Sequence, residues 1–136
     1  YPKIKQYMED KISFVNQYGY VETLLGRKRF LAAELGSSNF QIREFAQRAA
    51  INQPLQGTAA DLIKMAMIEV DKQLTQKGLK AKMIMQVHDE LIVEARDDVA
   101  DKVCDIVKEE MENACALKVK LLSDAHIGKS WYEAKG

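Results

Sequence analysis

The stretch Met83-Ile-Met-Gln-Val-His88-Asp89-Glu90-Leu-Ile-Val-Glu-Ala95 places three consecutive polar residues between two short apolar runs rich in β-branched side chains. This pattern is typical of two strands joined by a tight turn, so it predicts a β-hairpin connected at His88-Asp89-Glu90. Paired strands hold a hairpin tip in place, and carboxylates there can bind divalent cations against phosphate oxygens. His88-Asp89-Glu90 alone favours an ordinary solvated turn over a metal-binding one. The rest of the chain has to decide between the two.

The composition is that of a globular domain with a core of its own. The chain has 136 residues, of which 47% are hydrophobic and 29% charged. No run approaches the roughly 20 apolar residues of a membrane span. Tyr1-Pro2-Lys3 does not begin a signal peptide, so we expect a cytoplasmic protein without a membrane partner. Because an initiating Met is missing, we expect a piece of a longer chain. Cys104 and Cys115 would lie about 16 Å apart along a helix axis, too far for a disulfide, so we expect reduced thiols.

The charge is zero overall but unevenly distributed. Residues 1–64 carry nine Lys/Arg against six Asp/Glu, whereas residues 65–136 carry eleven against fourteen. With zero net charge, the chain lacks the overall positive charge that is typical of nucleic-acid-binding proteins. A weakly basic half and an acidic half are compatible with a protein that has an anion-binding site and a separate cation-binding site. An asymmetry this small supports that hypothesis without establishing it.

Apolar residues recur at helical spacing in four segments, which predicts four helices. The first begins at Pro2 and ends at Gly19, and Ser38 with Gln41 has the capping-box spacing for the second. The segment Asn52-Gln53-Pro54 is expected to interrupt the helix, because a residue before proline disfavours the helical conformation.

The third helix is expected to start with Thr58 as its cap and Asp61 as its N3 residue, and to end at Gly78. Its buried face is predicted to consist of Ala59, Leu62, Ile63, Ala66, Met67, Val70 and Leu74. Asp97 is predicted to cap a fourth helix with Val99, Val103, Ile106, Val107 and Met111 on its apolar side. Residues 20–25 and 117–122 have the pattern of extended segments. Helices with a few strands in hairpins predict an α+β fold.

A basic turn is predicted at Gly26-Arg27-Lys28-Arg29. Three cations on a tight loop repel one another unless an anion relieves them, and nucleic-acid phosphates are a natural partner. An exposed loop kept in solution by its charges explains the same pattern equally well.

Polar side chains also follow a four-residue spacing in Arg48-x-x-x-Asn52-x-x-x-Gln56. Arg, Asn and Gln donate hydrogen bonds to acceptors on base edges. Donors in the minor groove can test the geometry of a base pair without distinguishing its sequence, because correct pairs present acceptors there at similar places. The alternative is that Asn52 and Gln56 cap neighbouring helices.

The hairpin tip combines three kinds of chemistry. A neutral His88 can donate one hydrogen bond and accept another, whereas Asp89 and Glu90 lie on opposite sides of an extended chain. One carboxylate is then a direct metal ligand, and the other assists. No Cys/His cluster predicts zinc, no Ser-His-Asp arrangement predicts a hydrolase, and no Gly-rich phosphate loop is present.

Together these stretches resemble the C-terminal part of the bacterial family A DNA polymerases. The resemblance rests on Gly19-Tyr-Val-Glu-Thr-Leu-Leu-Gly-Arg-Lys-Arg-Phe-Leu31, Phe45-Ala-Gln-Arg-Ala-Ala-Ile-Asn-Gln-Pro-Leu-Gln-Gly-Thr-Ala-Ala-Asp-Leu-Ile-Lys64, Met85-Gln-Val-His-Asp-Glu-Leu-Ile-Val-Glu94 and Gly128-Lys-Ser-Trp-Tyr132. The segments follow the order and approximate spacing of the family along nearly the whole chain.

The resemblance implies a magnesium-dependent nucleotidyltransferase that acts on primer–template DNA and dNTP in replication and repair at the bacterial nucleoid. Asp89 would bind one of two catalytic Mg²⁺ ions with Glu90 beside it, and His88 would approach the primer terminus. The residues implied to contact DNA near the nascent pair or along the backbone are Arg27, Lys28, Arg29, Arg48, Asn52 and Gln56.

Two motifs of the family have no counterpart in this sequence: the Asp-Tyr-Ser-Gln-Ile-Glu-Leu-Arg segment with the other metal-binding aspartate, and the nucleotide-binding helix. The resemblance therefore implies a polymerase fragment, with residues 1–50 on the fingers side and residues 51–136 in the palm. We expect these residues by themselves to be inactive. Without the strand of the missing segment, the hairpin would expose a sheet edge, which predicts a homodimer or swapped assembly.

Two other functions remain open. One is a non-catalytic DNA-binding module that uses Arg27–Arg29 and Arg48 to bind phosphates. A Mg²⁺ nuclease would need a second carboxylate cluster near Asp89, and the close acidic pair Asp97-Asp98 has the pattern of a helix start. The nuclease hypothesis therefore ranks well below the other two.

Overall fold

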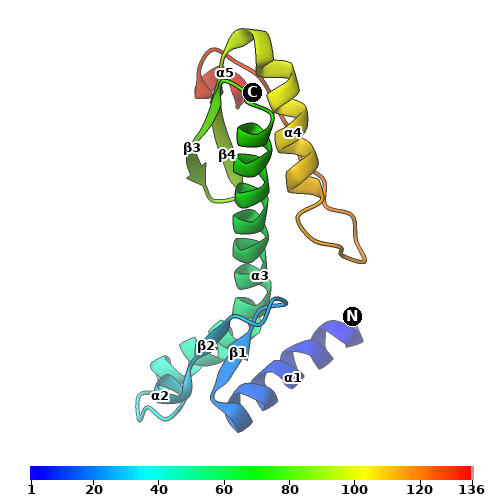
Figure 1. The fold of residues 1–136 in the computed structure, drawn as a ribbon. Coiled ribbons are helices and arrows are strands. Elements are labelled where there is room, and N and C mark those ends of the chain that lie inside the picture. Colours follow the sequence, from blue (N-terminus) through cyan, green and yellow to red (C-terminus); the bar gives the residue numbers. More distant parts are fainter. Residues whose placement is uncertain (136) are drawn as a thin grey trace. The chain divides into compact units, whose positions relative to one another are not determined.

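A computed structural model describes residues 1–135, which form an α+β fold of two compact units (Figure 1). The first unit comprises Tyr1–Asp61, and the second begins at Leu62. Among the described residues, none of the helices combines the length and apolar character needed to cross a bilayer. The predicted fold class is therefore confirmed.

The first unit packs two helices and the N-terminal part of a third around a small hairpin. Helix α1 (Pro2–Tyr18) ends at Gly19, whose φ of +75° is the left-handed conformation that glycine adopts easily. Strands β1 (Tyr20–Glu22) and β2 (Lys28–Phe30) pair antiparallel, and the short helix α2 (Ala32–Leu35) follows. The core of this unit consists of Val15, Val21, Leu31 and Ala50.

Helix α3 (Phe40–Gln76) runs without a break through the predicted interruption, with Pro54 inside it. The prediction of two helices separated at Asn52-Gln53-Pro54 is therefore wrong, and so is the prediction that Thr58 caps a helix. The Thr58 hydroxyl instead donates a hydrogen bond to the Pro54 carbonyl within the helix. Arg27 and Arg29 of the first hairpin donate hydrogen bonds to α3 on both sides of Pro54.

The start of α3 also differs from the prediction. The cap is Asn39, whose Oδ1 accepts a hydrogen bond from the Gln41 amide at 2.9 Å, and the predicted capping role of Ser38 is wrong. Asn39 directly precedes the helix, one residue nearer than Ser38, so its side-chain oxygen reaches this amide with the geometry that an N-cap requires. The prediction that the helix ends near Gly78 is confirmed, since α3 stops at Gln76 and Gly78 has a φ of +60°.

The second unit packs a hairpin and a helix on the C-terminal half of α3. Strands β3 (Ala81–Val87) and β4 (Glu90–Ala95) pair antiparallel, as predicted, with a register irregularity between Met83 and Met85. The core consists of Val70, Leu74, Val103 and Val107. The apolar side of α4 is confirmed, whereas Ala59, predicted to lie in the core, is exposed.

The segments around α4 contain further differences. Asp97 does not cap the helix, because it lies inside the 3-10 turn η1 (Asp97–Val99) that precedes α4 (Ala100–Glu112) and makes no side-chain capping bond. Residues 117–122 form no strand, since no neighbouring segment of the described chain pairs with them. Cys104 and Cys115 are free, as expected, although Cys115 lies beyond the helix. The chain ends in the short helix α5 (Trp131–Ala134).

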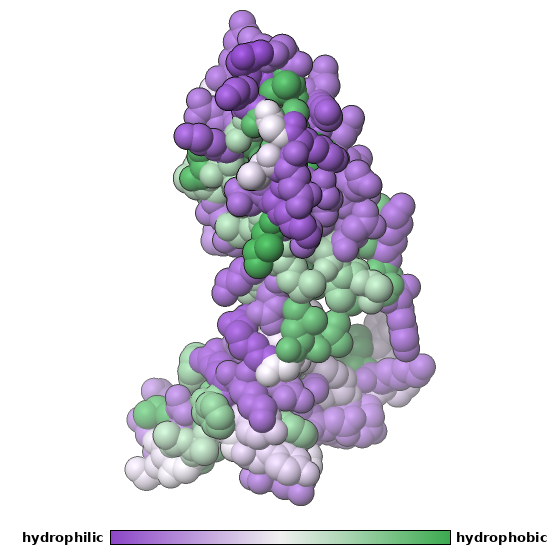
Figure 2. Space-filling model, viewed as in Figure 1, coloured by the Kyte–Doolittle hydropathy of each residue, from purple (hydrophilic) through white to green (hydrophobic). Residues whose placement is uncertain are grey.

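Large apolar side chains are exposed in both units. Hydrophobic residues are visible among the mostly hydrophilic surface in Figure 2. Examples are Leu24 and Leu55 in the first unit, and Ile68 and Ile84 in the second. Scattered apolar side chains are a normal part of a protein surface.

Candidate functional site

The tip of the β3–β4 hairpin is a two-residue connection, His88-Asp89, and Glu90 is already the first residue of β4. His88 has a φ of +54°, in the left-handed region that histidine tolerates better than most side chains. A left-handed first residue is typical of two-residue hairpin turns. The Gln86 side-chain amide donates a hydrogen bond to the His88 carbonyl at 2.9 Å, so the tip is braced by its own strand.

The two acidic residues of the tip differ in their surroundings. Asp89 is exposed, and no described residue donates a hydrogen bond to its carboxylate. Glu90 Oε1 lies 3.7 Å from Lys135 Nζ beyond α5, in an exposed ion pair of the kind that contributes about 1 kcal/mol or less. Within residues 1–135, no three His, Cys, Asp or Glu side chains gather as a metal site would require. The tip offers the hard oxygen donors that Mg²⁺ prefers, but only part of a ligand set.

The basic segment does not form the turn that its sequence predicts. Lys28 and Arg29 lie in β2, and only Arg27 lies in the loop before it. The ammonium of Lys28 is 4.3 Å from the Tyr20 ring centroid, a favourable cation–π distance. Because successive side chains of a strand point to opposite sides, the three cations do not share one surface.

Both arginines of this segment contact α3. Arg27 Nε donates to Asp61 Oδ1 at 2.7 Å, and Nη2 donates to the Gly57 carbonyl at 3.0 Å. Arg29 Nη1 donates to Gln53 Oε1 at 2.9 Å. The anion beside Arg27 is thus a carboxylate of the same chain. The hypothesis that these arginines meet DNA phosphates stays a prediction, and Lys28 is the cation that has the most freedom to do so.

The polar residues of α3 spaced by four lie on one exposed face. In a continuous helix Arg48, Asn52 and Gln56 follow one another at about 6 Å along the axis and about 40° around it. We call these three residues the polar ladder. Arg48 Nη1 is 3.4 Å from Glu44 Oε2 in an exposed pair, whereas the Asn52 and Gln56 amides bond to no described residue. The alternative that they cap neighbouring helices is therefore wrong.

The sequence interpretation missed the group that joins the first hairpin to α3. Among the described residues, Thr23 and Asp61 are the buried polar side chains, 4% and 9% exposed. Thr23 Oγ1 donates to Asp61 Oδ2 at 2.6 Å and accepts a hydrogen bond from the Arg27 amide. The available signal was Gly57, since a glycine inside a helical pattern marks close approach of another segment.

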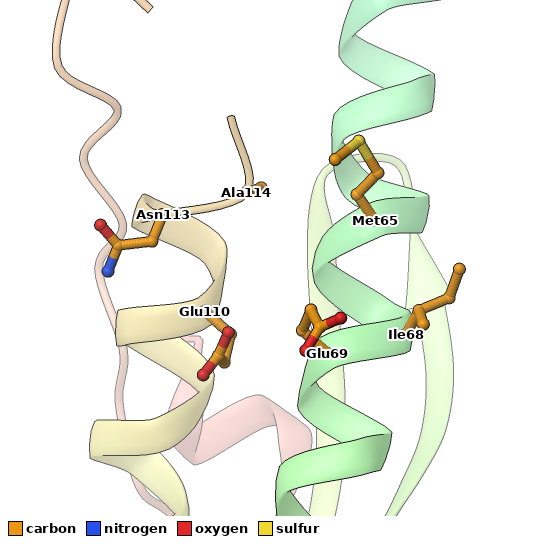
Figure 3. Close-up of a pocket in the computed structure, with 6 residues that line it drawn as sticks. All are labelled: Met65, Ile68, Glu69, Glu110, Asn113 and Ala114. Atoms are coloured by element: carbon orange, nitrogen blue, oxygen red, sulfur yellow. The ribbon is translucent and has the colours of Figure 1, made fainter. Parts of the chain in front are cut away.

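A small hollow between α3 and α4 carries no comparable chemistry. It measures about 160 Å³, and Glu69 of α3 and Glu110 of α4 line it from opposite sides (Figure 3). Glu69 already pairs with Lys72 at 3.1 Å. Two carboxylates repel phosphate, and the volume is below the roughly 300 Å³ at which ligand pockets begin. Two candidate sites therefore remain, each within its own unit: the polar ladder with the basic segment in the first unit, and the hairpin tip in the second.

Comparison with known proteins gives one consistent family. The profile of DNA polymerase family A matches residues 1–133. DNA polymerase I from Bacillus subtilis is 50% identical over 132 residues, which are 97% of this chain and 15% of that protein. DNA polymerase I from Caldicellulosiruptor bescii is 47% identical over 135 residues, which are 99% of this chain and 16% of that protein. The chain thus spans about one sixth of the length of these relatives.

The fold is shared with a solved structure of the POL domain of Pol1 from M. smegmatis, in complex with DNA primer-template and dNTP. The TM-score is 0.91 at 43% sequence identity, and the match covers 97% of this chain and 23% of that chain.

Proposed function

Because the chain belongs to the family A DNA polymerases, we propose that it is part of a DNA-directed DNA polymerase, which adds dNTPs to a primer 3′ end. The partners that we propose are primer–template DNA and dNTP, supported by the ligands of the similar POL domain from M. smegmatis. The observation that carries the proposal is the family match over residues 1–133 combined with an exposed face of unbonded donors on α3.

The polar ladder is proposed to contact the minor groove near the nascent base pair. Asn52 and Gln56 expose amide donors without competing partners, and Arg48 is held only by a surface ion pair. Minor-groove acceptors occupy similar places in every correct pair, so donors at fixed spacing favour correct pairs of any sequence. Lys28 is proposed to add a phosphate contact, and His88 to lie near the primer terminus.

The hairpin tip is proposed to supply part of the metal site. Asp89 would hold Mg²⁺ directly, since its carboxylate is exposed and accepts no hydrogen bond from the described residues. Glu90 would assist less directly, because Lys135 lies beside it. When bound, the two Mg²⁺ ions of such an enzyme would reduce the electrostatic repulsion between the primer hydroxyl oxygen and the nucleotide phosphates. The described residues provide too few carboxylates for both ions.

From the family membership we also propose that residues 1–50 lie on the fingers side and residues 51–136 in the palm. The enzyme is expected to act at the bacterial nucleoid in the cytoplasm, where its DNA substrate is. The 136 residues by themselves are proposed to be inactive, because they contain one aspartate-bearing metal segment and no dNTP-binding helix. Primer extension with this chain alone should show no product, and Mg²⁺-dependent incorporation of dNTP would contradict the proposal.

A second candidate function, DNA binding without catalysis, is what we expect of the isolated chain. Fluorescence anisotropy with a primer–template duplex tests it at low salt. Gln56→Ala should weaken binding roughly three- to tenfold, the loss expected for one hydrogen bond. Gln47→Ala is the matched control, because Gln47 is equally an exposed amide on α3 but lies about 180° around the helix from Gln56. Equal effects of the two substitutions would contradict a role for the ladder.

A further inference from the structure

Helix α3 has an intrinsic weak point inside the polar ladder. Pro54 has no N–H to donate to the Ala50 carbonyl, and proline in a helix interior costs about 3 kcal/mol. Gly57 adds about 1 kcal/mol relative to alanine. Pro54 lies between Asn52 and Gln56, so any change in the direction of the helix there moves one end of the ladder relative to the other.

The β1–β2 hairpin contacts α3 on both sides of this weak point. The bonded α3 residues lie between positions 53 and 61. The hydrogen bonds are Arg29 Nη1 to Gln53 Oε1, Arg27 Nη2 to the Gly57 carbonyl, the Leu24 amide to Thr58 Oγ1, Thr23 Oγ1 to Asp61 Oδ2, and Arg27 Nε to Asp61 Oδ1.

Two features make this contact strong. The Thr23–Asp61 bond is buried, where hydrogen bonds to a charged group contribute more than at the surface. The helix also presents Gly57 to the hairpin, and a Cβ atom there would lie 2.6 Å from Thr23 Cγ2. The residue that weakens the helix thus permits the hairpin to approach closely enough to bond to it.

We propose that the β1–β2 hairpin is a splint that fixes the course of helix α3 across Pro54–Gly57 and so fixes the positions of Arg48 and Asn52 relative to Gln56. Thr23, Arg27 and Asp61 are then positioning residues, which act through the ladder without touching DNA. Arg27 has this role in place of a phosphate contact. The consequence for base-pair testing rests on the function proposed above, whereas the splint itself is independent of it.

Amide hydrogen exchange of the 136-residue chain tests the splint without DNA. Thr23→Val removes the hydroxyl at constant charge, and Arg27→Gln removes the guanidinium. Each should lower protection at Gly57 and Thr58 at least about tenfold and leave residues 66–74 unchanged. Thr23→Ser, which keeps the hydroxyl, should retain most of the protection. Lys28→Gln is the matched control on the neighbouring position, since Lys28 contacts the Tyr20 ring and not α3.

The splint is overturned if Thr23→Val and Arg27→Gln leave protection around Gly57 unchanged, or if protection falls equally at all amides of α3. A second measurement addresses the ladder. Affinity for a matched primer–template should fall about three- to tenfold in Thr23→Val and recover in Thr23→Ser, since all three chains carry the same charge. An unchanged affinity in Thr23→Val would overturn the positioning role. Absence of duplex binding in the unaltered chain would instead contradict the proposed function and leave the exchange result standing.

Discussion

Replacing Gly57 with alanine separates two physical effects that act in opposite directions. In an isolated helix, alanine is more favourable than glycine by about 1 kcal/mol, so Gly57→Ala should stabilise α3. In this structure the added Cβ would lie 2.6 Å from Thr23 Cγ2 and 3.0 Å from the Gln53 amide nitrogen. We expect the steric effect to exceed the gain in propensity.

The magnitude follows from the distances. Carbon atoms in contact prefer about 3.5–4.0 Å, so the hairpin would have to move by about 1 Å or more. Overpacking of this kind costs about 1–3 kcal/mol. After the gain of about 1 kcal/mol in propensity, Gly57→Ala should lower the free energy of unfolding by up to about 2 kcal/mol. The Gln53 amide ends a flexible side chain and contributes little to this cost.

A double-mutant cycle with Thr23→Ser isolates the contact. Thr23→Ser removes the Cγ2 methyl and keeps the hydroxyl that donates to Asp61, at a cost of about 0.8 kcal/mol for the lost methyl. In the Thr23→Ser background, Gly57→Ala should be neutral or stabilising. Urea denaturation followed by circular dichroism measures the coupling energy, which we expect to be at least about 1 kcal/mol. If Gly57→Ala alone stabilises the protein, or if the coupling is zero, the hairpin does not press on Gly57 and the reasoning fails.

Three further predictions concern the rest of the molecule. The Tyr7 hydroxyl donates to the Ile51 carbonyl at 3.0 Å, so Tyr7→Phe should cost about 1 kcal/mol at neutral pH. Burial raises the pKa of Tyr7 above 10, so this stabilisation is fully present below pH 10 and is lost as the pH rises through the pKa of the folded state. Urea titrations at pH 7 and pH 11 should therefore show the difference between the two chains shrinking. Leu74→Ala should lower stability by about 2–5 kcal/mol, because Leu74 is 3% exposed in the core of the second unit, and a loss below 1 kcal/mol would contradict that packing. The β3–β4 sheet has two strands whose outer edges are unpaired among the described residues, so sedimentation at high concentration should show self-association, and a strictly monomeric profile would contradict it.

Local sequence signals were sufficient for the elements whose causes are local. The β3–β4 hairpin follows from two apolar runs around a polar turn, and the end of α1 follows from Gly19, which adopts the left-handed conformation there. The apolar side of α4 follows from helical periodicity. Each of these depends on interactions between residues near one another in the chain, which a pattern can record.

The errors have a common origin in contacts between distant segments. Pro54 indicates a break by itself, yet α3 continues, accompanied by bonds from residues about 30 positions earlier in the chain. The pattern at residues 117–122 indicates a strand, yet a strand needs a neighbour that the described chain does not offer. The basic segment is predicted to form a turn, yet Lys28 and Arg29 lie in a strand that pairs with β1.

The sequence by itself determined the family, the α+β class and the chemistry of the residues that could serve a polymerase, because these depend on residue types in a given order. Only the tertiary structure decided which of those residues are available. The polar ladder lies on one exposed face because the helix is continuous, and the Arg27 guanidinium is engaged because it donates hydrogen bonds to Asp61 and to the Gly57 carbonyl. The physical reason is that the type of a residue determines which groups its side chain can bind. Only the folded chain determines which distant segments lie beside that side chain and already occupy its hydrogen-bonding groups.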